Sequence, residues 1–370
     1  MGIAWAALQI PVVFATSATG LLWARMLLGA AEGPAFPFTA VALFQWFPDE
    51  KRNLPVTVVS TGGSFGLVIA GLLIPWITAT WGWRSNFETL SVIGAVWCVL
   101  WYTIGCNPRL TRNSENRYAG AHANAAHRLP DALPYRALFA DRSVLAIYGS
   151  AIAGYTVLGV TMTWLPLYLQ RGLGYSATSA GRWFTVVVLI LVPLQVMLSG
   201  LSQYLMRHGM SSRNARARLL CAAMVASALL LVALGTLSLM PAEKAIVIAV
   251  ASALGALSTA FGPVMLAEVT PSGQQPAMLA VFTAVGNAAA AVAAVVTGHL
   301  IEAAGTTSPH GYELGYVGVA GVIVCAALGC LRWLHTERSR KTLCASAAND
   351  EASELTTARV LNQMSEAGRS

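Results

Sequence analysis

Long apolar runs with few charged residues recur along this sequence from its first residues to about residue 335. Of its 370 residues, 56% are hydrophobic and only 11% are charged, and the charged residues cluster between the runs. A soluble protein of this size would carry roughly a quarter charged residues. A helix that crosses a bilayer needs roughly 20 consecutive apolar residues, and most of the runs have about that length. The sequence therefore predicts an all-α, polytopic membrane protein.

About ten transmembrane helices are predicted, in two bundles of four and six. The expected spans are 2–18, 21–47, 56–80, 88–106, 143–169, 180–205, 217–240, 243–267, 276–303 and 313–335. A long polar segment with three prolines, 107–142, separates the fourth span from the fifth. We therefore expect an N-terminal bundle (1–106), a cytoplasmic linker (107–142) and a C-terminal bundle (143–335). The polar tail, 336–370, is expected to be disordered.

The charges between the spans predict that both termini are cytoplasmic. Sixteen basic residues would then lie on the cytoplasmic side: Lys51, Arg52, Arg109, Arg112, Arg117, Arg128, Arg136, Arg142, Arg207, Arg213, Arg216, Arg218, Arg332, Arg338, Arg340 and Lys341. Only four would lie outside: Arg84, Arg171, Arg182 and Lys244. Cytoplasmic loops of membrane proteins carry such an excess of Lys and Arg. The same excess explains the net charge of +7 without a nucleic-acid partner.

No motif for a cofactor or for soluble-enzyme chemistry is present. The six cysteines lie mostly inside or at the ends of apolar runs, without a CxxC pair or a cluster of histidines, so no metal site or disulfide framework is predicted. The sequence lacks a GxxxxGK[ST] phosphate loop, an HExxH motif and a GxSxG motif. We therefore expect neither an enzyme nor an ATP-driven pump.

Two charged residues, Arg25 and Glu32, interrupt the second apolar run. Seven residues separate them, so they project from one helix face about 10 Å apart along the axis. A charge at bilayer depth is costly unless it faces protein or a water-filled cavity. One interpretation is an anion site beside a proton site, because the guanidinium suits carboxylates and the carboxyl group can exchange a proton. The alternative is that each residue pairs with a neighbouring helix and only holds the bundle together.

Proline and glycine follow Glu32 closely. Pro34 and Pro37 remove backbone donors, and Gly33 permits close helix contact, so the helix should weaken just beyond the glutamate. A kink that serves alternating access and simple close packing are both consistent with this pattern.

Asn287 and Tyr155 are the other candidate ligand contacts. Asn287 is an amide among small residues of the ninth span, and its partner could be a neighbouring helix or a ligand. Tyr155 brings a hydroxyl into the fifth span, where a core aromatic with one hydrogen bond is the alternative. Glu88, Glu268 and Glu302 lie at span ends, where we expect water to reach them, and receive no functional role.

Several motifs give a family resemblance. The run 25–37 (RMLLGAAEGPAFP) followed by 46–52 (WFPDEKR) resembles the Major Facilitator Superfamily and, within it, the anion:cation symporter family of sugar-acid permeases and sialin. Further similar motifs are GWRSNF at 82–87, TWLP at 163–166 and Gly286-Asn287. The similarity is most specific in the second span and looser elsewhere.

The resemblance implies a twelve-helix transporter in which the site lies between two six-helix halves. The ten spans then correspond to helices three to twelve, and the first two helices are missing from this sequence. Arg25 would bind the carboxylate of the substrate, Glu32 would take part in proton coupling, and Asn287 would contact the polar part of the substrate. Gln203 stands where relatives carry an aspartate in the gating segment 200–207.

The sequence thus predicts a proton-coupled symporter of a small organic anion in the bacterial inner membrane. Its partners would be the carboxylate substrate, protons and the lipid bilayer, and no cofactor is expected. The missing helices favour an alternative, a truncated, transport-inactive membrane protein or a substrate sensor. A facilitator without proton coupling is the remaining possibility if Glu32 is structural. The sequence does not identify the anion.

Overall fold

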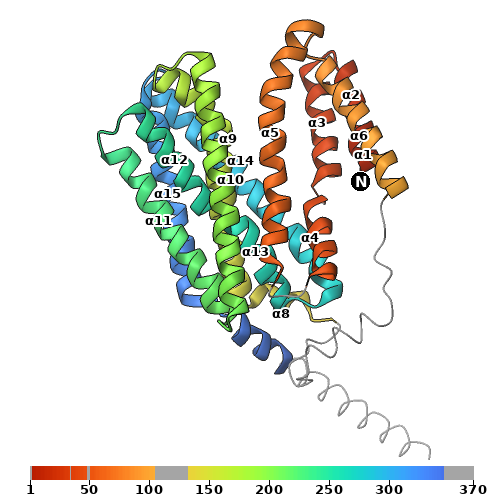
Figure 1. Cartoon of the computed structure of the whole chain (residues 1–370), viewed down its shortest axis with the longest axis vertical. Helices are drawn as coiled ribbons and strands as arrows, with labels where there is room; N and C mark the ends of the chain where they lie inside the picture. The colour runs from red at the N-terminus through yellow and green to blue at the C-terminus, as the bar shows by residue number, and fades with distance from the viewer. Residues whose placement is uncertain (1, 34, 48–50, 105–131, 346–370) are drawn as a thin grey trace, which may run out of the picture.

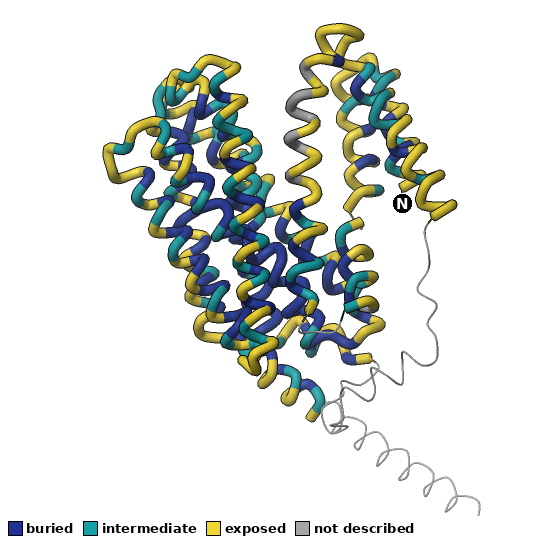
Figure 2. Tube along the Cα trace, viewed as in Figure 1, coloured by how far each residue is buried: buried dark blue, intermediate teal, exposed yellow. Residues whose placement is uncertain are grey.

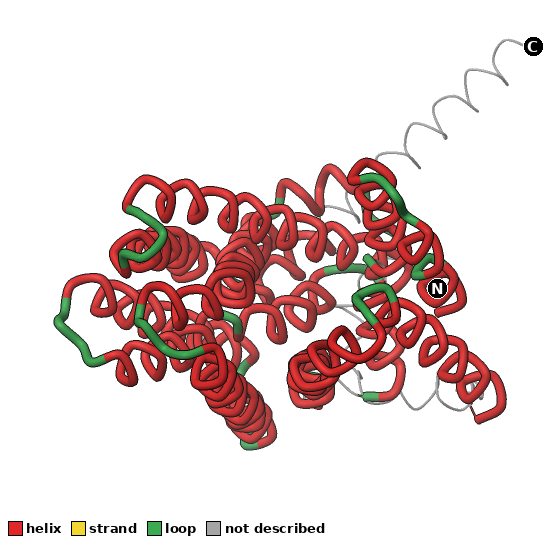
Figure 3. The backbone as a smooth tube through the Cα atoms, turned by 90° about the horizontal axis from the view of Figure 1, so that it is seen from above, coloured by secondary structure: helices red, strands yellow, loops and turns green. Residues whose placement is uncertain are grey.

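The computed structural model describes residues 2–33, 35–47, 51–104 and 132–345 of the chain. These residues form helices and connecting loops, with no strand among them (Figures 1 and 3). The helices gather into two bundles, and the N-terminal one is drawn red to orange in Figure 1. This architecture confirms the predicted all-α fold, and the chain is a multi-pass membrane protein.

The N-terminal bundle contains six helical pieces. They are α1 (Gly2–Ala7), α2 (Ile10–Phe14), α3 (Ala18–Glu32), α4 (Ala35–Trp46), α5 (Asn53–Trp81) and α6 (Ser85–Ile104). Ser17 begins α3 as an N-cap, since its side chain accepts a hydrogen bond from the Gly20 amide at 3.0 Å. Helix α3 ends at Glu32 and α4 begins at Ala35. Of the two prolines expected to weaken the helix beyond Glu32, Pro34 lies outside the described residues and Pro37 lies inside α4.

The C-terminal bundle is longer and more continuous. It contains α8 (Tyr135–Ala140), α9 (Arg142–Leu167), the π-helical turn η3 (Tyr168–Gly172), α10 (Ala177–Arg207), the π-helical turn η4 (Arg213–Arg218), α11 (Leu219–Thr236), α12 (Pro241–Gly255), α13 (Leu257–Val269), the 3-10 turn η5 (Ser272–Gln274), α14 (Gln275–Ala304) and α15 (Pro309–Trp333). Together, α12 and α13 make up one membrane-length segment, as α3 and α4 do in the other bundle.

Eight helical segments of the described residues are long and apolar enough to cross a membrane. Helix α5 is not among these eight, but it has 29 residues and no charged side chain. The first predicted span differs from expectation, because 2–18 was expected and the apolar helical stretch Gly2–Phe14 is shorter. At 1.5 Å per residue, 13 residues reach only about 20 Å of a hydrocarbon core of about 30 Å.

Packing is much denser in the C-terminal bundle than in the N-terminal one (Figure 2). The main cluster of buried apolar residues is built from the C-terminal helices, and within the described chain only Ala40, Phe44 and Val56 of the other bundle join it as buried members. Along α6, Val92 and Val99 are both 63% exposed. Apolar side chains exposed on a membrane-length helix are suited to contact lipid, whereas the core that orders the fold lies in the C-terminal half.

The segments that flank the C-terminal bundle dock onto it. Leu133, in the predicted linker, donates from its amide to Gln274 Oε1 at 3.0 Å and accepts from Gln274 Nε2 at 2.8 Å. Residues 336–345 of the predicted disordered tail are helical, and Leu343 is buried in the main core. Ser339 Oγ donates to Ser143 Oγ at 2.8 Å. The remaining parts of the linker and tail predictions, 107–131 and 346–370, lie outside the described residues.

Candidate functional site between the bundles

A cavity of about 530 Å³ lies where the two bundles meet. The N-terminal bundle contributes Gly29, Glu32, Gly33, Ala35, Phe36 and Ser60, and the C-terminal bundle contributes Tyr155, Leu158, Thr259, Thr283 and Asn287. Tyr155 and Asn287 lie near the middle of α9 and α14, well inside helices long enough to cross the membrane. The cavity is therefore placed where a solute could meet both bundles at once.

Three of the four residues selected from the sequence line this one cavity. Glu32 is the last residue of α3, and Tyr155 and Asn287 face it from the other bundle. The structure gives no hydrogen bond or ion pair to the Glu32 carboxylate, the Tyr155 hydroxyl or the Asn287 amide from any described residue. Polar groups at membrane depth need a partner. In this cavity, water or a bound solute can supply it.

Arg25 is not among the residues that line the cavity. It lies two helical turns before Glu32, and its guanidinium carbon stands 4.6 Å from the centroid of the Phe87 ring, near the start of α6. This is a cation–π contact, which leaves the guanidinium hydrogens available to an anion. The structure thus separates the two charges predicted to share a site: the carboxyl group lines the cavity and the cation lies beyond it.

Three of the hydroxyl groups in the cavity wall, those of Ser60, Thr259 and Thr283, are already committed as donors. Ser60 Oγ donates to Val56 O at 2.8 Å, and Thr283 Oγ1 donates to Leu279 O at 2.8 Å. Thr259 Oγ1 likewise donates to a carbonyl of its own helix turn at 2.8 Å. Because a hydroxyl has one hydrogen, these three oxygens can only accept a further hydrogen bond. Among the described residues that line the cavity there is no Lys, Arg or His. The wall therefore favours a ligand that brings its own hydroxyl donors.

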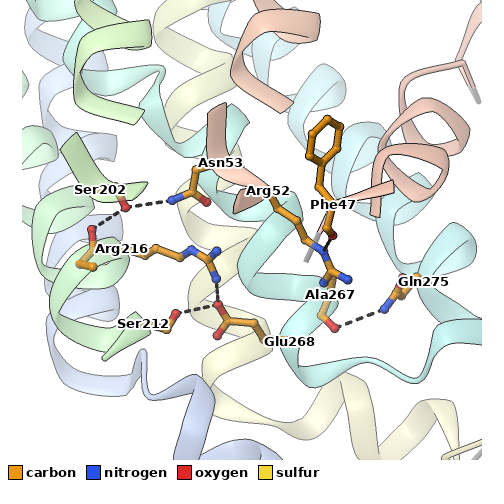
Figure 4. A network of polar contacts seen from close by, with 10 residues as sticks. Phe47, Arg52, Asn53, Ser202, Ser212, Arg216, Ala267, Glu268 and Gln275 are labelled. Atoms are coloured by element: carbon orange, nitrogen blue, oxygen red, sulfur yellow. Dashed lines mark hydrogen bonds and ion pairs between the residues drawn. The ribbon is translucent and has the colours of Figure 1, made fainter. Parts of the chain in front are cut away.

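Side-chain hydrogen bonds join the bundles at the N-terminal end of α5 (Figure 4). Asn53 Nδ2 donates to Ser202 Oγ at 2.8 Å, and Thr57 Oγ1 donates to Ser199 Oγ at 2.6 Å, so that α5 is fastened to α10. Gln203, beside Ser202, is buried, and no described residue is hydrogen-bonded to its side-chain oxygen. In this region the described contacts between α5 and α10 are thus made by neutral groups.

A buried ion pair lies beside this contact. Arg216, in η4, pairs with Glu268 near the end of α13, and Ser212 Oγ also donates to Glu268 Oε1 at 2.6 Å (Figure 4). The Arg216 side chain is 0% exposed and that of Glu268 only 11%. Glu268 is therefore much less accessible to water than expected for a glutamate at a span end, because a sequentially distant arginine covers most of the carboxylate. Glu88 and Glu302 are exposed, as expected.

A second buried acidic residue was missed by the sequence reasoning. Glu313, near the start of α15, accepts from Lys244 Nζ at 2.6 Å and from the Tyr168 hydroxyl at 2.8 Å. Lys244 and Glu313 lie in different predicted spans or at their ends, and nothing in their local sequence pairs them. The only sign of this buried site in the sequence was a glutamate near the start of an otherwise apolar helix.

We predict that removing the α5–α10 hydrogen bonds separates the bundles at this end. Each such bond contributes about 1 kcal/mol net, so Asn53→Ala with Thr57→Val should shift the ratio of separated to closed molecules by roughly 30-fold. The distance between the bundles would be measured by double electron–electron resonance. The spin labels would be attached to cysteines that replace the exposed residues Lys51 and Arg207.

The matched control is Thr80→Val, because Thr80 on the same helix donates only to Trp76 O of its own turn. A distance distribution for the double variant that overlays both the control and the unsubstituted protein would contradict a latching role for Asn53 and Thr57.

Curated relatives of this sequence are transporters rather than enzymes. The chain is 25% identical over 302 residues to the "Probable galactarate/D-glucarate transporter GarP" of Escherichia coli (strain K12), which covers 76% of this chain and 66% of that protein. It is 28% identical over 225 residues to the "D-galactonate transporter" of Escherichia coli O6:H1, covering 57% of this chain and 52% of the relative. The chain thus spans slightly less than two thirds of the first relative and about half of the second.

Solved transporters share its fold. A double tryptophan mutant of XylE superposes with a TM-score of 0.69 at 16% identity, covering 93% of this chain and 80% of that one. The human organic anion transporter MFSD10 gives a TM-score of 0.61 at 12% identity, covering 89% and 75%. A sequence model of the Major Facilitator Superfamily matches residues 1–242, well over half of the chain. Two helical bundles around a cavity, transporter relatives and this match agree, and the chain belongs to the Major Facilitator Superfamily.

Proposed function

We propose that this protein carries a sugar acid together with a proton across the bacterial inner membrane. The observation that carries the proposal is the cavity between the bundles, where the Glu32 carboxylate, the Tyr155 hydroxyl and the Asn287 amide have no partner among the described residues. Three wall hydroxyls that can only accept hydrogen bonds suit a solute rich in hydroxyl donors. The relatives described above are named as a probable galactarate/D-glucarate transporter and a D-galactonate transporter, and these substrates are acids of this kind.

Arg25 and the cavity would hold the two ends of the substrate. The cavity accepts the hydroxyl groups, with Tyr155 and Asn287 as contacts from the C-terminal bundle. Arg25 lies two turns further along α3, about 10 Å away at 1.5 Å per residue. A guanidinium is well suited to bind a carboxylate with two parallel hydrogen bonds. No described residue that lines the cavity carries a positive charge, so the carboxylate of the substrate would be bound by Arg25.

Glu32 would couple transport to protons. No basic side chain lines the cavity in the described part of the chain, so an ionised Glu32 repels an anionic substrate. Binding a proton at Glu32 removes that repulsion, and binding of proton and anion then becomes mutually favourable. Both termini would lie in the cytoplasm, as the charge distribution of the loops predicts.

Uptake into proteoliposomes tests the proposal. Radiolabelled galactarate, galactonate and glucuronate would be supplied outside, with a proton gradient directed inward and the neutral sugar galactose as the matched control. We expect accumulation of at least one acid that a protonophore abolishes. Failure to accumulate any of the acids would contradict proton-coupled transport, and saturable binding without uptake would support the substrate-sensor alternative.

We predict that Arg25→Ala weakens apparent substrate affinity. A hydrogen bond to a charged group contributes about 1.5–3 kcal/mol, so the substrate concentration for half-maximal uptake should rise roughly 10- to 100-fold. Arg25→Lys keeps the charge but loses the geometry for two parallel hydrogen bonds. Its substrate concentration for half-maximal uptake should therefore lie between those of the unsubstituted protein and Arg25→Ala. Arg182→Ala, at an exposed arginine near the start of α10, is the control. Equal half-saturation in Arg25→Ala and Arg182→Ala would remove Arg25 from the binding site.

A further inference from the structure

Gly286, the residue before Asn287 on α14, lies directly against the ring of Tyr155. We propose that Gly286 sets the size of the cavity by positioning Tyr155, and so limits the length of the acid that the protein accepts. This inference rests on the proposed function for the identity of the ligand. The observation behind the inference is the geometry of the cavity, and this geometry does not depend on that function.

The space at Gly286 is filled by the tyrosine. A Cβ atom added at Gly286 would lie 2.6 Å from Cγ and 2.9 Å from Cε2 of Tyr155, and closer still to Cδ2. Real Cβ atoms essentially never approach another heavy atom more closely than 3.0 Å. Gly286 is buried within α14 and has ordinary helical geometry. Glycine is therefore needed here for space and not for an unusual backbone conformation.

The surroundings leave the ring one direction in which to move. Phe282 packs edge-to-face on Tyr155, with centroids 6.3 Å apart, and is itself fully buried. Behind Phe282, a Cβ on Gly262 of α13 would lie 2.5 Å from the phenyl ring, so Phe282 cannot retreat. At Gly159, a Cβ would lie 2.7 Å from the Cβ of Ala290, so α9 and α14 are already in close contact. The open side of the Tyr155 ring is the cavity.

A methyl group at position 286 should therefore push the Tyr155 ring into the cavity, beside Asn287. Tightly packed interiors respond to added atoms by displacing side chains. The displaced ring would reduce the room for a long solute much more than for a short one. Gly286 is thus a positioning residue that acts through Tyr155, without itself binding the substrate.

Thiol labelling measures the size of the cavity without any transport. Asn287→Cys would place a thiol on the exposed cavity wall, and its labelling would be followed with a small methanethiosulfonate (ethylammonium) and a bulky one (biotin-linked). The same chain without the Asn287→Cys change corrects for the native cysteines. Adding Gly286→Ala should slow the bulky reagent about tenfold and leave the small reagent nearly unchanged.

Tyr155→Ala provides the rescue and Gly321→Ala the matched control. Removal of the ring should restore bulky labelling in the Gly286→Ala background, because the methyl group would no longer have a ring to displace. A Cβ at Gly321 of α15 meets nothing within 4 Å, so Gly321→Ala should change neither rate. Equal slowing of both reagents, no slowing, or no rescue by Tyr155→Ala would overturn the proposal.

A parallel uptake experiment addresses selectivity. Gly286→Ala should reduce uptake of six-carbon galactarate relative to three-carbon glycerate, whereas Gly321→Ala should leave the ratio unchanged. If the unsubstituted protein accumulates none of galactarate, galactonate and glucuronate, the proposed function fails while the labelling result still decides whether Gly286 sets the cavity size. If uptake occurs but the ratio is unaffected by Gly286→Ala, the selectivity role fails and the proposed function stands.

Discussion

Glu32→Gln is expected to abolish accumulation of a sugar acid driven by a proton gradient while leaving exchange of internal for external acid intact. Glutamine keeps the size of the side chain and its hydrogen-bonding capacity but has no titratable proton. The cavity then resembles the protonated state permanently. The substrate can still bind and cross in either direction, but its movement no longer requires that of a proton.

The reason is thermodynamic and does not depend on the details of the motion. A proton gradient can drive an uphill flux only if proton and substrate affect each other's binding, or the balance of the two access states. In the described chain, Glu32 is the one titratable carboxyl group that lines the cavity. Removing its titration removes that coupling unless another group supplies it.

Two assays on the same proteoliposomes separate the outcomes. Counterflow of labelled galactarate measures exchange, and net uptake with an inward proton gradient measures accumulation. Glu88→Gln is the matched control, since Glu88 is an exposed carboxylate at the start of α6 that does not line the cavity. Normal accumulation by Glu32→Gln would remove Glu32 from proton coupling and favour a facilitator in which this residue is structural.

The elements of the fold that depend on local sequence were predictable. Apolar run length predicted the membrane helices. The short first helical stretch was overestimated because residues 15–18 contain no charge or proline to mark its end, although the helix ends at Phe14. Hydropathy reports where a chain can be buried in lipid and does not report where its helix ends.

The tail shows a second limit of local reasoning. Residues 336–345 are polar enough to predict disorder, but Leu343 packs into the core and Ser339 bonds to Ser143, almost 200 residues earlier. Such long-range contacts stabilise a segment whose composition alone would not. The pairing of Arg216 with Glu268 could not be predicted for the same reason, since 52 residues separate them.

The candidate site was predictable in its residue types and only partly in its arrangement. Helical spacing placed Arg25 and Glu32 on one face, and that spacing holds because both lie on α3. It could not show that Arg25 stacks on Phe87, because this contact depends on how α6 packs beside α3. Nor could it show that the Tyr155 ring fills the space beside Gly286, since the approach of α9 to α14 is a property of the folded bundle.

Arg216→Met is expected to cause the largest loss of stability of any single substitution considered above. It would remove the Arg216 guanidinium from the largely buried Glu268 carboxylate, and breaking a buried ion pair typically costs about 3–5 kcal/mol. The Ser212 hydroxyl would remain as a donor to Glu268 but cannot neutralise a full charge. Because η4 connects α10 to α11 next to the α5–α10 contact, we expect this end of the molecule to loosen first.

The double variant Arg216→Met/Glu268→Met shows whether the cost arises from the unpaired charge. Replacing both members of a buried pair with apolar side chains is often neutral, so the double variant should unfold in detergent close to the temperature of the unsubstituted protein. Arg218→Met, at an exposed arginine two residues away, controls for the loss of a positive charge near the membrane surface. If Arg216→Met and Arg218→Met unfold at the same temperature, the buried pair makes no net contribution. If the double variant is as unstable as Arg216→Met, the stabilising interactions of Arg216 are not those with Glu268.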